Sequence, residues 1–202
     1  MKWDELEEEP CSVARTIGVI GDRWTLLILR ECFLRTRRFE GFQSALGITR
    51  HLLAERLKKL VRTGILRRIP YQESPKRHEY ILTQKGLDLY PIMMAIVHWG
   101  DTHMVDERGR PVLHEHKKCG KLFNPVMVCS ECGEPLMAKE VVTRPGPGAR
   151  PSVAKRALER NAKAASRTGA SSFRRIRRTP AQDCELRRQG SQIFAPTFAD
   201  VA

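Results

Sequence analysis

The stretch TRHLLAERLKKLVRTG at residues 49–64 decides the fold of this chain. Its aliphatic residues at positions i, i+4, i+7 and i+8 are Leu53, Leu57, Leu60 and Val61. This spacing places them on one face of a helix, where they can pack on a core. Thr49 is a residue type that caps a helix start, and Gly64 is the type that ends one. We therefore predict a helix over residues 50–63 whose opposite face is polar and positively charged.

The segments on either side of this helix extend the pattern. Residues 39–45 are expected to form a short helix, joined to the basic helix by the tight connection Gly47-Ile48-Thr49. Residues 65–71 and 77–82 alternate with period two around the turn 72–76, which predicts a two-stranded hairpin. A short helix, a turn, a basic helix and a hairpin in this order predict a winged helix-turn-helix, a fold that binds DNA.

Three more helical segments are expected around this unit. The first is Ser12–Ile20, and the strongly apolar run 22–34 predicts a buried central helix. The last covers residues 83–100, starts at the capping residue Thr83, and should be kinked or divided by Pro91. It is too apolar for a lone surface helix, so part of it should pack on a second subunit. The predicted fold class is mainly α with one small antiparallel β hairpin.

The composition indicates a polyanionic partner. The 202 residues include 36 Lys and Arg against 23 Asp and Glu, for a net charge of +13 and a pI near 9.9. Such a basic balance is most often associated with nucleic acid. No apolar run reaches the roughly 18 residues of a membrane span, and the acidic start MKWDELEEEP does not resemble a secretory signal. We expect a cytoplasmic protein whose six cysteines are thiols or metal ligands.

Charge is divided unevenly among four segments. Residues 1–10 have one base and five acids, and residues 11–104 have 16 bases and 8 acids. Residues 105–143 have 6 of each, and residues 144–202 have 13 bases and 4 acids. These shifts predict an acidic N-terminal segment, a winged-helix domain for DNA binding and dimerisation, a small module, and a basic tail. The tail begins with the linker-like RPGPGARP, and its composition predicts disorder.

Several motifs between residues 11 and 104 occur together in one order and spacing. They are Cys11, GDRWTLLILR at 21–30, Arg38-Phe39, Leu53-x-x-Arg56-Leu57-x-x-Leu60, Gly64, Tyr71, Pro75, Glu79-Tyr80-x-Leu82-Thr83, Gly86 and Trp99-Gly100. On these motifs the segment resembles the HxlR-type family of bacterial and archaeal transcription regulators, within the MarR-like superfamily. The resemblance implies a homodimer with terminal helices at the dimer contact, which binds operator DNA and acts more often as a repressor than as an activator. A symmetric dimer would bind an inverted repeat.

Ten side chains are candidates for contact with double-stranded DNA. Thr49, Arg50 and His51 lie near the N-terminus of the basic helix, where side chains reach base edges. From the basic helix and the turn before the short helix, five more candidates should contact phosphates: Lys58, Lys59, Arg62, Arg37 and Arg38. At the hairpin tip, Lys76 and Arg77 should reach the flanking backbone or the minor groove. Arg56, at the edge of the apolar arc, has two interpretations, contact with DNA or pairing with a carboxylate inside the domain.

Residues 114–136, HEHKKCGKLFNPVMVCSECGEPL, contain a group of metal-ligand residue types. The candidate ligands are His116, Cys119, Cys129 and Cys132, and His114 is a rival for the histidine position. Two of the cysteines have the two-residue spacing of a metal knuckle, and four such ligands suit a structural, tetrahedral Zn²⁺. The pattern predicts a short zinc-ribbon-like module. The alternative is a loop with unmetallated thiols.

The remaining cysteines differ in their expected roles. Cys11 precedes the first helix near Arg15, and the family resemblance implies a sensor of oxidants or electrophiles at this position in some members. The alternative is a small residue partly buried at the dimer contact. Cys32 lies in an apolar helix and should be inert, and Cys184 in the tail has no assignable partner.

We expect no enzymatic activity, because the chain contains no HExxH, P-loop, GxGxxG or GxSxG motif. We predict that the protein is a sequence-specific transcriptional regulator that responds to a small-molecule or electrophile inducer. Two alternatives come from other segments. The basic tail could make the chain a sequence-blind nucleic-acid-packing protein, and the cysteine-rich segment could be a zinc-held protein-interaction module.

Overall fold

The computed structural model describes residues 9–151 together with residues 155, 156, 158, 159 and 162. Most of the acidic segment predicted at 1–10, and most of the basic tail predicted at 144–202, Cys184 included, lie outside the described residues. Met1–Lys155 form one compact unit, which contains all the named helices and strands.

Four helices form the N-terminal half of this unit, at the predicted positions: α2 (Ser12–Ile20), α3 (Arg23–Phe33), α4 (Phe39–Leu46) and α5 (Arg50–Arg62). The central helix α3 starts where Asp22 accepts a hydrogen bond of 3.0 Å from the backbone N–H of Thr25. Helix α4 ends at Gly47, whose φ of 60° lies in the left-handed region that favours glycine. The turn between α4 and α5 is therefore short, and the two helices form a helix-turn-helix.

The core lies between α3, α4, α5 and the first strand. Its fully buried apolar side chains are Ile28, Leu29, Phe42, Leu53, Leu57, Leu60, Ile65 and Leu66. Three of these are the leucines that the spacing on α5 placed on one face. The predicted inward face of the basic helix is confirmed, because burial of these leucines holds α5 against α3 and α4.

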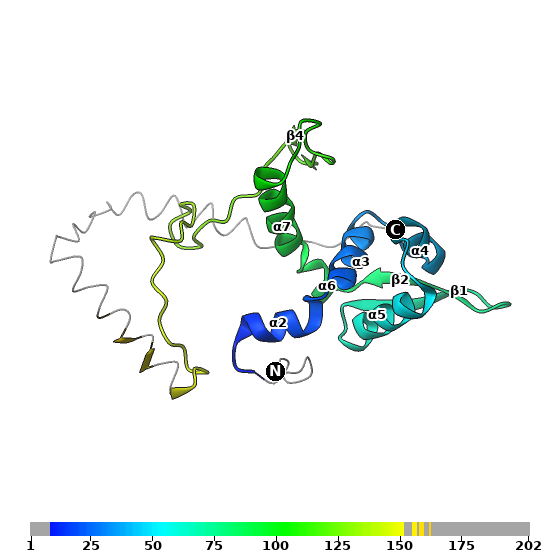
Figure 1. Cartoon of the computed structure of the whole chain (residues 1–202), viewed down its shortest axis with the longest axis horizontal. Helices are drawn as coiled ribbons and strands as arrows, with labels where there is room; N and C mark the ends of the chain where they lie inside the picture. The colour runs from blue at the N-terminus through cyan, green and yellow to red at the C-terminus, as the bar shows by residue number, and fades with distance from the viewer. Residues whose placement is uncertain (1–8, 152–154, 157, 160–161, 163–202) are drawn as a thin grey trace. The chain divides into compact units, whose positions relative to one another are not determined.

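The hairpin is formed by β1 (Leu66–Gln72) and β2 (Arg77–Leu82), paired antiparallel from Leu66 opposite Leu82 to Pro70 opposite His78. Pro70 is tolerated because both strands of a two-stranded sheet are edges. The backbone N–H of Tyr80 donates to the carbonyl of Arg37, 2.8 Å away, which anchors the hairpin beside α4. The hairpin projects from the helices as a wing (Figure 1).

The predicted last helix is divided into α6 (Gln84–Leu87) and α7 (Tyr90–His103), as Pro91 suggested. Thr83 caps α6, since its hydroxyl accepts from the Gly86 N–H at 3.2 Å. Gly86 packs so close to the residue before β1 that a Cβ there would lie 2.4 Å from the Ile65 carbonyl oxygen. Pro91 lies in the first turn of α7, where a missing N–H breaks no helical hydrogen bond.

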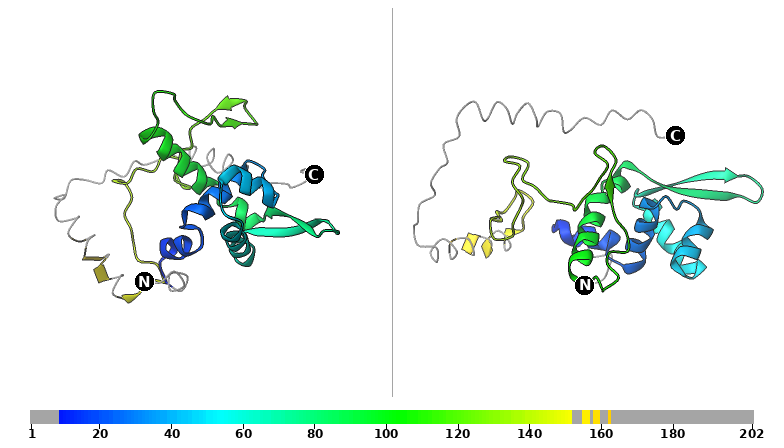
Figure 2. Two further views of the ribbon diagram at one scale, coloured as in Figure 1. Left: turned by 45° about the vertical axis from the view of Figure 1, so that its right-hand side comes forward. Right: turned by 90° about the horizontal axis from the view of Figure 1, so that it is seen from above.

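Helices α2 and α7 extend from the helix-turn-helix on the side away from the wing (Figures 1 and 2). Phe33 of α3 and Tyr90 of α7 stack edge to face, with ring centroids 5.1 Å apart. Much of the apolar surface of both helices is nevertheless exposed; it comprises Val13, Ile17, Tyr90, Ile92, Ile96 and Trp99. No helix among the described residues is both long enough and apolar enough to cross a membrane.

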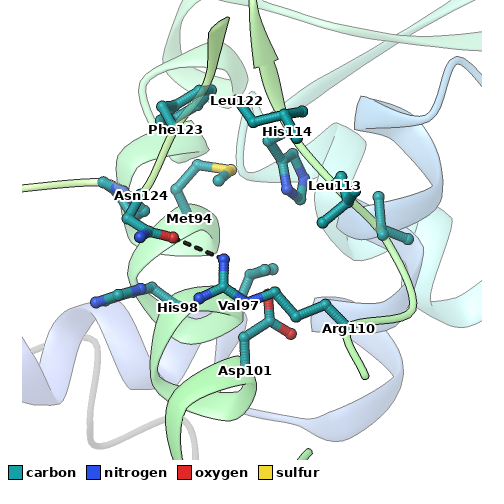
Figure 3. A pocket seen from close by; sticks show the side chains of 12 residues that line it. Met94, Val97, His98, Asp101, Arg110, Leu113, His114, Leu122, Phe123 and Asn124 are labelled. Carbon is teal, nitrogen blue, oxygen red and sulfur yellow. Dashed lines mark hydrogen bonds between the residues drawn. The ribbon is translucent and has the colours of Figure 1, made fainter. Parts of the chain in front are cut away.

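The segment that follows α7 is an appendage (residues 105–143) with two short strands, β3 (Glu115–His116) and β4 (Lys121–Leu122). All of its residues are described, and none of them is buried. It touches α7 around a hollow of about 130 Å³, where Arg110 donates a 2.7 Å hydrogen bond to Asn124 (Figure 3). The winged helix is therefore stabilised by a buried core, whereas the appendage has little internal packing.

Candidate nucleic-acid interface

Helix α5 turns a continuous polar arc to solvent, opposite its buried leucines. The exposed residues of this arc are Arg50, His51, Ala54, Glu55, Lys58 and Arg62. Within it, His51 lies 3.6 Å from Glu55, one turn further along. Four of the predicted DNA-contact side chains are thus on one accessible surface, as the sequence suggested. We call this surface the α5 arc.

The first residues of α5 are exposed at its N-terminus. Thr49 has the extended backbone of a cap residue, but its side chain makes no capping hydrogen bond. Arg50 lies over the Phe39 ring at 5.1 Å, which orients the guanidinium while leaving the residue exposed. The hydroxyl and the guanidinium are therefore both available to a ligand at this end of the helix.

Lys59 is used differently from the sequence-based expectation of a phosphate contact. Its ammonium group donates a 2.6 Å hydrogen bond to the carbonyl of Gly18, near the C-terminal end of α2. The side chain is only partly exposed and lies off the α5 arc. A lysine at a helix C-terminus satisfies an orphan carbonyl and complements the helix dipole. Lys59 therefore connects α5 to α2, and its charge is directed away from the arc.

Arg38 also has a structural contact. Its Nε lies 3.0 Å from Oε1 of Glu79 on β2, and its guanidinium lies over the Tyr71 ring at 4.4 Å. The hydrogen bond to Glu79 raises the pKa of Arg38 further above its usual range. These contacts tie the wing to α4. The Arg38 side chain remains 60% exposed, so it can still reach a phosphate, and Arg37 beside it is exposed as well.

The wing and the start of α5 enclose a hollow of about 190 Å³. Its lining residues are Phe39, Glu40, Arg50, Tyr71, Lys76, Arg77, His78 and Tyr80. Lys76 and Arg77, the two predicted wing contacts, are exposed at this edge. Desolvation and the nearby positive charges of Arg68 and Lys76 lower the pKa of His78, which disfavours its charged form. The positive charge of the hollow therefore comes from Arg and Lys.

Arg56 pairs with a carboxylate inside the domain, which is one of its two predicted interpretations. Its Nε donates to Asp22 at 3.1 Å, across 34 positions of sequence. Asp22 also accepts hydrogen bonds from the backbone and the hydroxyl of Thr25. Partial burial acts to raise the pKa of Asp22, but the bonds from Thr25 and the charge of Arg56 outweigh it, so the pKa lies below its usual range. Arg56 thus braces α5 against the start of α3.

The cysteines of the helical region occupy contrasting environments. Burial, together with the charge of Glu31, raises the pKa of Cys32 to about 12, so this thiol is inert near neutral pH, as expected. Cys11 is exposed and occupies the N-cap position of α2. Cys32 is only partly exposed, so Cys11 is the more accessible of the two to a reagent in solution.

The four predicted zinc ligands are brought together as two pairs. His116 Nδ1 lies 3.4 Å from the Cys119 sulfur, and hydrogen bonds from the backbone of Glu131 and from Cys132 lower the pKa of Cys129. Within the described part of the chain, no three His, Cys, Asp or Glu residues are arranged so that they could share a metal ion. The four predicted ligands therefore lie as two separate pairs, one in each half of the appendage.

Comparison with known proteins identifies relatives of this fold and sequence. Residues 19–108 match the family model described as HxlR-like helix-turn-helix. An HTH-type transcriptional regulator of Mycobacterium tuberculosis is 43% identical over 137 residues, which covers 68% of this chain and 87% of that protein. An HTH-type transcriptional regulator of Bacillus subtilis is 31% identical over 96 residues, 47% of this chain and 75% of that protein.

Two solved structures are similar to this chain over about seven tenths of its length. The crystal structure of PA1607, assigned as a transcription factor, is 34% identical, with a TM-score of 0.63 over 71% of this chain and 99% of that one. PA1374 of Pseudomonas aeruginosa, with the same assignment, is 32% identical, with a TM-score of 0.52 over 72% and 99% of the two chains. The mycobacterial match spans 137 of the 202 residues. A segment of that length cannot end before residue 137, so the match includes residues 109–137, which follow the end of the family model at residue 108.

Proposed function

This chain belongs to the HxlR-like helix-turn-helix family of transcriptional regulators, and we propose that it is a repressor that binds an inverted DNA repeat as a homodimer. The observation that supports this most directly is the α5 arc: a basic surface on a helix whose other face is fixed in the core. The similarity to HTH-type regulators along most of the chain is consistent with it. Repression would follow from occupancy of a promoter, which blocks its use.

In this proposal the N-terminus of α5 enters the major groove. Thr49, Arg50 and His51 would contact base edges, because they lie at the end of the helix where recognition residues lie in related folds. Lys58 and Arg62, further along the α5 arc, would contact phosphates. Lys76 and Arg77 of the wing would contact the flanking backbone or the minor groove, and the exposed Arg37 and Arg38 before α4 would contact phosphates.

We propose that the dimer forms through α2 and α7. Both helices present apolar side chains to solvent, and Trp99 is 60% exposed in the single chain. Large apolar side chains exposed on two helices are typical of a protein–protein contact. The location of α2 and α7 away from the wing supports the same assignment, because a dimer formed there leaves both α5 arcs accessible.

Selection of bound sequences from random DNA tests the proposed function. We expect the full chain to enrich an inverted repeat with half-sites about one or two helical turns apart. A variant with Arg50 and His51 both changed to Ala should lose the enriched sequence while keeping its helical circular dichroism. A monomer in solution that binds every duplex with equal affinity would contradict the proposal.

The basic tail supports a second candidate function, sequence-blind packing of nucleic acid. Residues 144–202 have an excess of nine positive charges, and such charge adds salt-sensitive affinity for any polyanion. Removal of residues 144–202 separates the two functions. A specific regulator keeps its preferred operator after this deletion, whereas a packing protein loses its binding to DNA.

The inducer would act through the exposed Cys11 if it is an electrophile. Cys11 lies at the start of α2, one of the two helices assigned to the dimer contact, so its modification would alter that contact. A Cys11→Ser variant should then stay bound to DNA in the presence of quinones or peroxide. If the reagent released Cys11→Ser and the chain with Cys11 from DNA to the same extent, this role would be contradicted.

A further inference from the structure

The appendage contains a structural repeat. Residues 114–123, HEHKKCGKLF, and residues 127–136, MVCSECGEPL, form two hairpins that correspond at an offset of 13 positions (127 against 114, 136 against 123). In the first, the N–H of Phe123 donates to the carbonyl of His114 at 3.0 Å; in the second, the N–H of Leu136 donates to the carbonyl of Met127 at 2.9 Å. The next residue pairs inward also correspond, because Glu115 pairs with Leu122 and Val128 pairs with Pro135.

The tips of the two hairpins have the same backbone. The N–H of Gly120 donates to the carbonyl of His116 at 2.8 Å, and the N–H of Gly133 donates to the carbonyl of Cys129 at 2.9 Å. Both glycines have positive φ, 63° and 75°, which a side chain would disfavour. The repeat therefore makes His116 the counterpart of Cys129.

Cys119 and Cys132 correspond in the same way, so each tip holds two potential metal ligands. At the first tip, His116 Nδ1 and the Cys119 sulfur are 3.4 Å apart. At the second, Cys129 and Cys132 lie on the same tight turn, which the hydrogen bond from the Gly133 N–H to the Cys129 carbonyl closes. One imidazole and three thiols are the ligand types that bind zinc.

The appendage lacks the packing that would hold two hairpins in a defined structure. None of its residues is buried, and Val126, Met127 and Val128, which lead into the second hairpin, are all at least half exposed. A hairpin with strands this short is marginally stable in water by itself. Small modules without a core are commonly stabilised by a structural metal, whose binding free energy becomes folding free energy.

We propose that the two hairpin tips together bind one structural Zn²⁺ through His116, Cys119, Cys129 and Cys132. Four protein ligands leave no open position, so the metal stabilises the appendage and performs no chemistry. The repeat also assigns the nitrogen ligand. His114 is the counterpart of Met127, not of a cysteine, and its ring lines the hollow against α7 (Figure 3).

The test uses the full chain, purified under reducing conditions, with the zinc content measured per chain. We expect about one zinc per chain, which a chelator removes together with the protease resistance of residues 105–143. Replacement of zinc by Co²⁺ should produce the visible absorption bands of tetrahedral thiolate coordination. Cys129→Ser should lose the metal, whereas Cys32→Ser, which changes a buried thiol far from the hairpins in sequence, should keep it.

Three histidine variants test the assignment given by the repeat. His116→Ala should lose the metal, His114→Ala should keep it, and His116→Cys should restore binding, because cysteine is the residue at the corresponding position of the second hairpin. In the Co²⁺ form, His116→Cys should also intensify the sulfur-to-metal absorption. Absence of zinc and of these bands from the reduced chain would overturn the proposal, and loss in His114→Ala with retention in His116→Ala would overturn the assignment.

Discussion

The winged helix and the appendage are stabilised by different means within one chain. In the winged helix, leucines at helical spacing are fully buried, and ion pairs such as Arg56–Asp22 join elements that are distant in sequence. In the appendage no residue is buried, and its order comes from short turns that repeat. The packed inner face of α5 holds its outer polar face in a defined position, whereas no buried side chain holds the two halves of the appendage.

Substitution of a core leucine tests this contrast with the largest expected effect. Leu57 is fully buried, so Leu57→Ala should destabilise the winged helix by about 2–5 kcal/mol, the loss of transfer free energy plus a cavity. Leu122 in the appendage is 62% exposed, so Leu122→Ala should change the free energy of unfolding by about 0.5 kcal/mol or less. Urea denaturation followed by circular dichroism measures both. Equal losses would mean that the appendage has a core of its own.

Removal of a base-contact candidate is the next largest effect, and it is measured on binding. Arg50→Ala should weaken operator binding by about 1–3 kcal/mol and relax the base preference, whereas Lys58→Ala should weaken all sequences alike. Binding titrations on the operator and on a scrambled duplex, at two salt concentrations, separate the two outcomes.

Lys59→Ala is the matched control for Lys58→Ala, because it removes the same charge from the neighbouring position. Its ammonium group is bonded to Gly18 on α2, so this variant should leave operator affinity nearly unchanged and lower the stability instead. A loss of affinity as large as that of Lys58→Ala would mean that Lys59 faces DNA.

A smaller effect is expected at Asp22, where the winged helix depends on a carboxylate. Asp22→Asn should destabilise it by about 0.5–2 kcal/mol at pH 7, because the negative charge at the N-terminus of α3 and the ion pair with Arg56 are lost, while Asn can still accept the capping hydrogen bond. The pKa of Asp22 is lowered, so its contribution is complete above the usual value of about 3.9 and disappears as pH falls through the lower folded value. The denaturation curves of the unmodified chain and of Asp22→Asn should therefore differ at pH 7 and converge in acid. The control Asp88→Asn changes an exposed residue and should match the unmodified chain at both pH values.

Thiol labelling is expected to have the smallest effect on stability, but it should distinguish clearly between two cysteines. The pKa of Cys32 is raised to about 12, so iodoacetamide at neutral pH should leave it unlabelled in the folded protein. Cys11 is exposed and should be labelled. Mass spectrometry of digested protein identifies the modified residue. Labelling of Cys32 at the rate of Cys11 would show that the α3 region opens readily.

Much of the winged helix could be predicted from local patterns. The positions of α5, the hairpin and the break before α7 follow from leucine spacing, period-two alternation and Pro91, all of which act within a few residues. The face of α5 that carries Arg50, His51, Lys58 and Arg62 follows from the same spacing. Lys59 could not be assigned in this way, because it lies between the two faces and its partner, Gly18, is 41 residues away.

The sequence by itself determined the order of the elements, the inward leucines and the set of metal-ligand residue types, because these depend on spacing along one segment. Only the tertiary structure decided which charges remain for a ligand and which are used internally. Arg56 and Lys59 are paired with Asp22 and Gly18 because folding brings α5 against the ends of α2 and α3. The correspondence of His116 with Cys129 likewise came from hydrogen-bond register, which residue types alone do not specify.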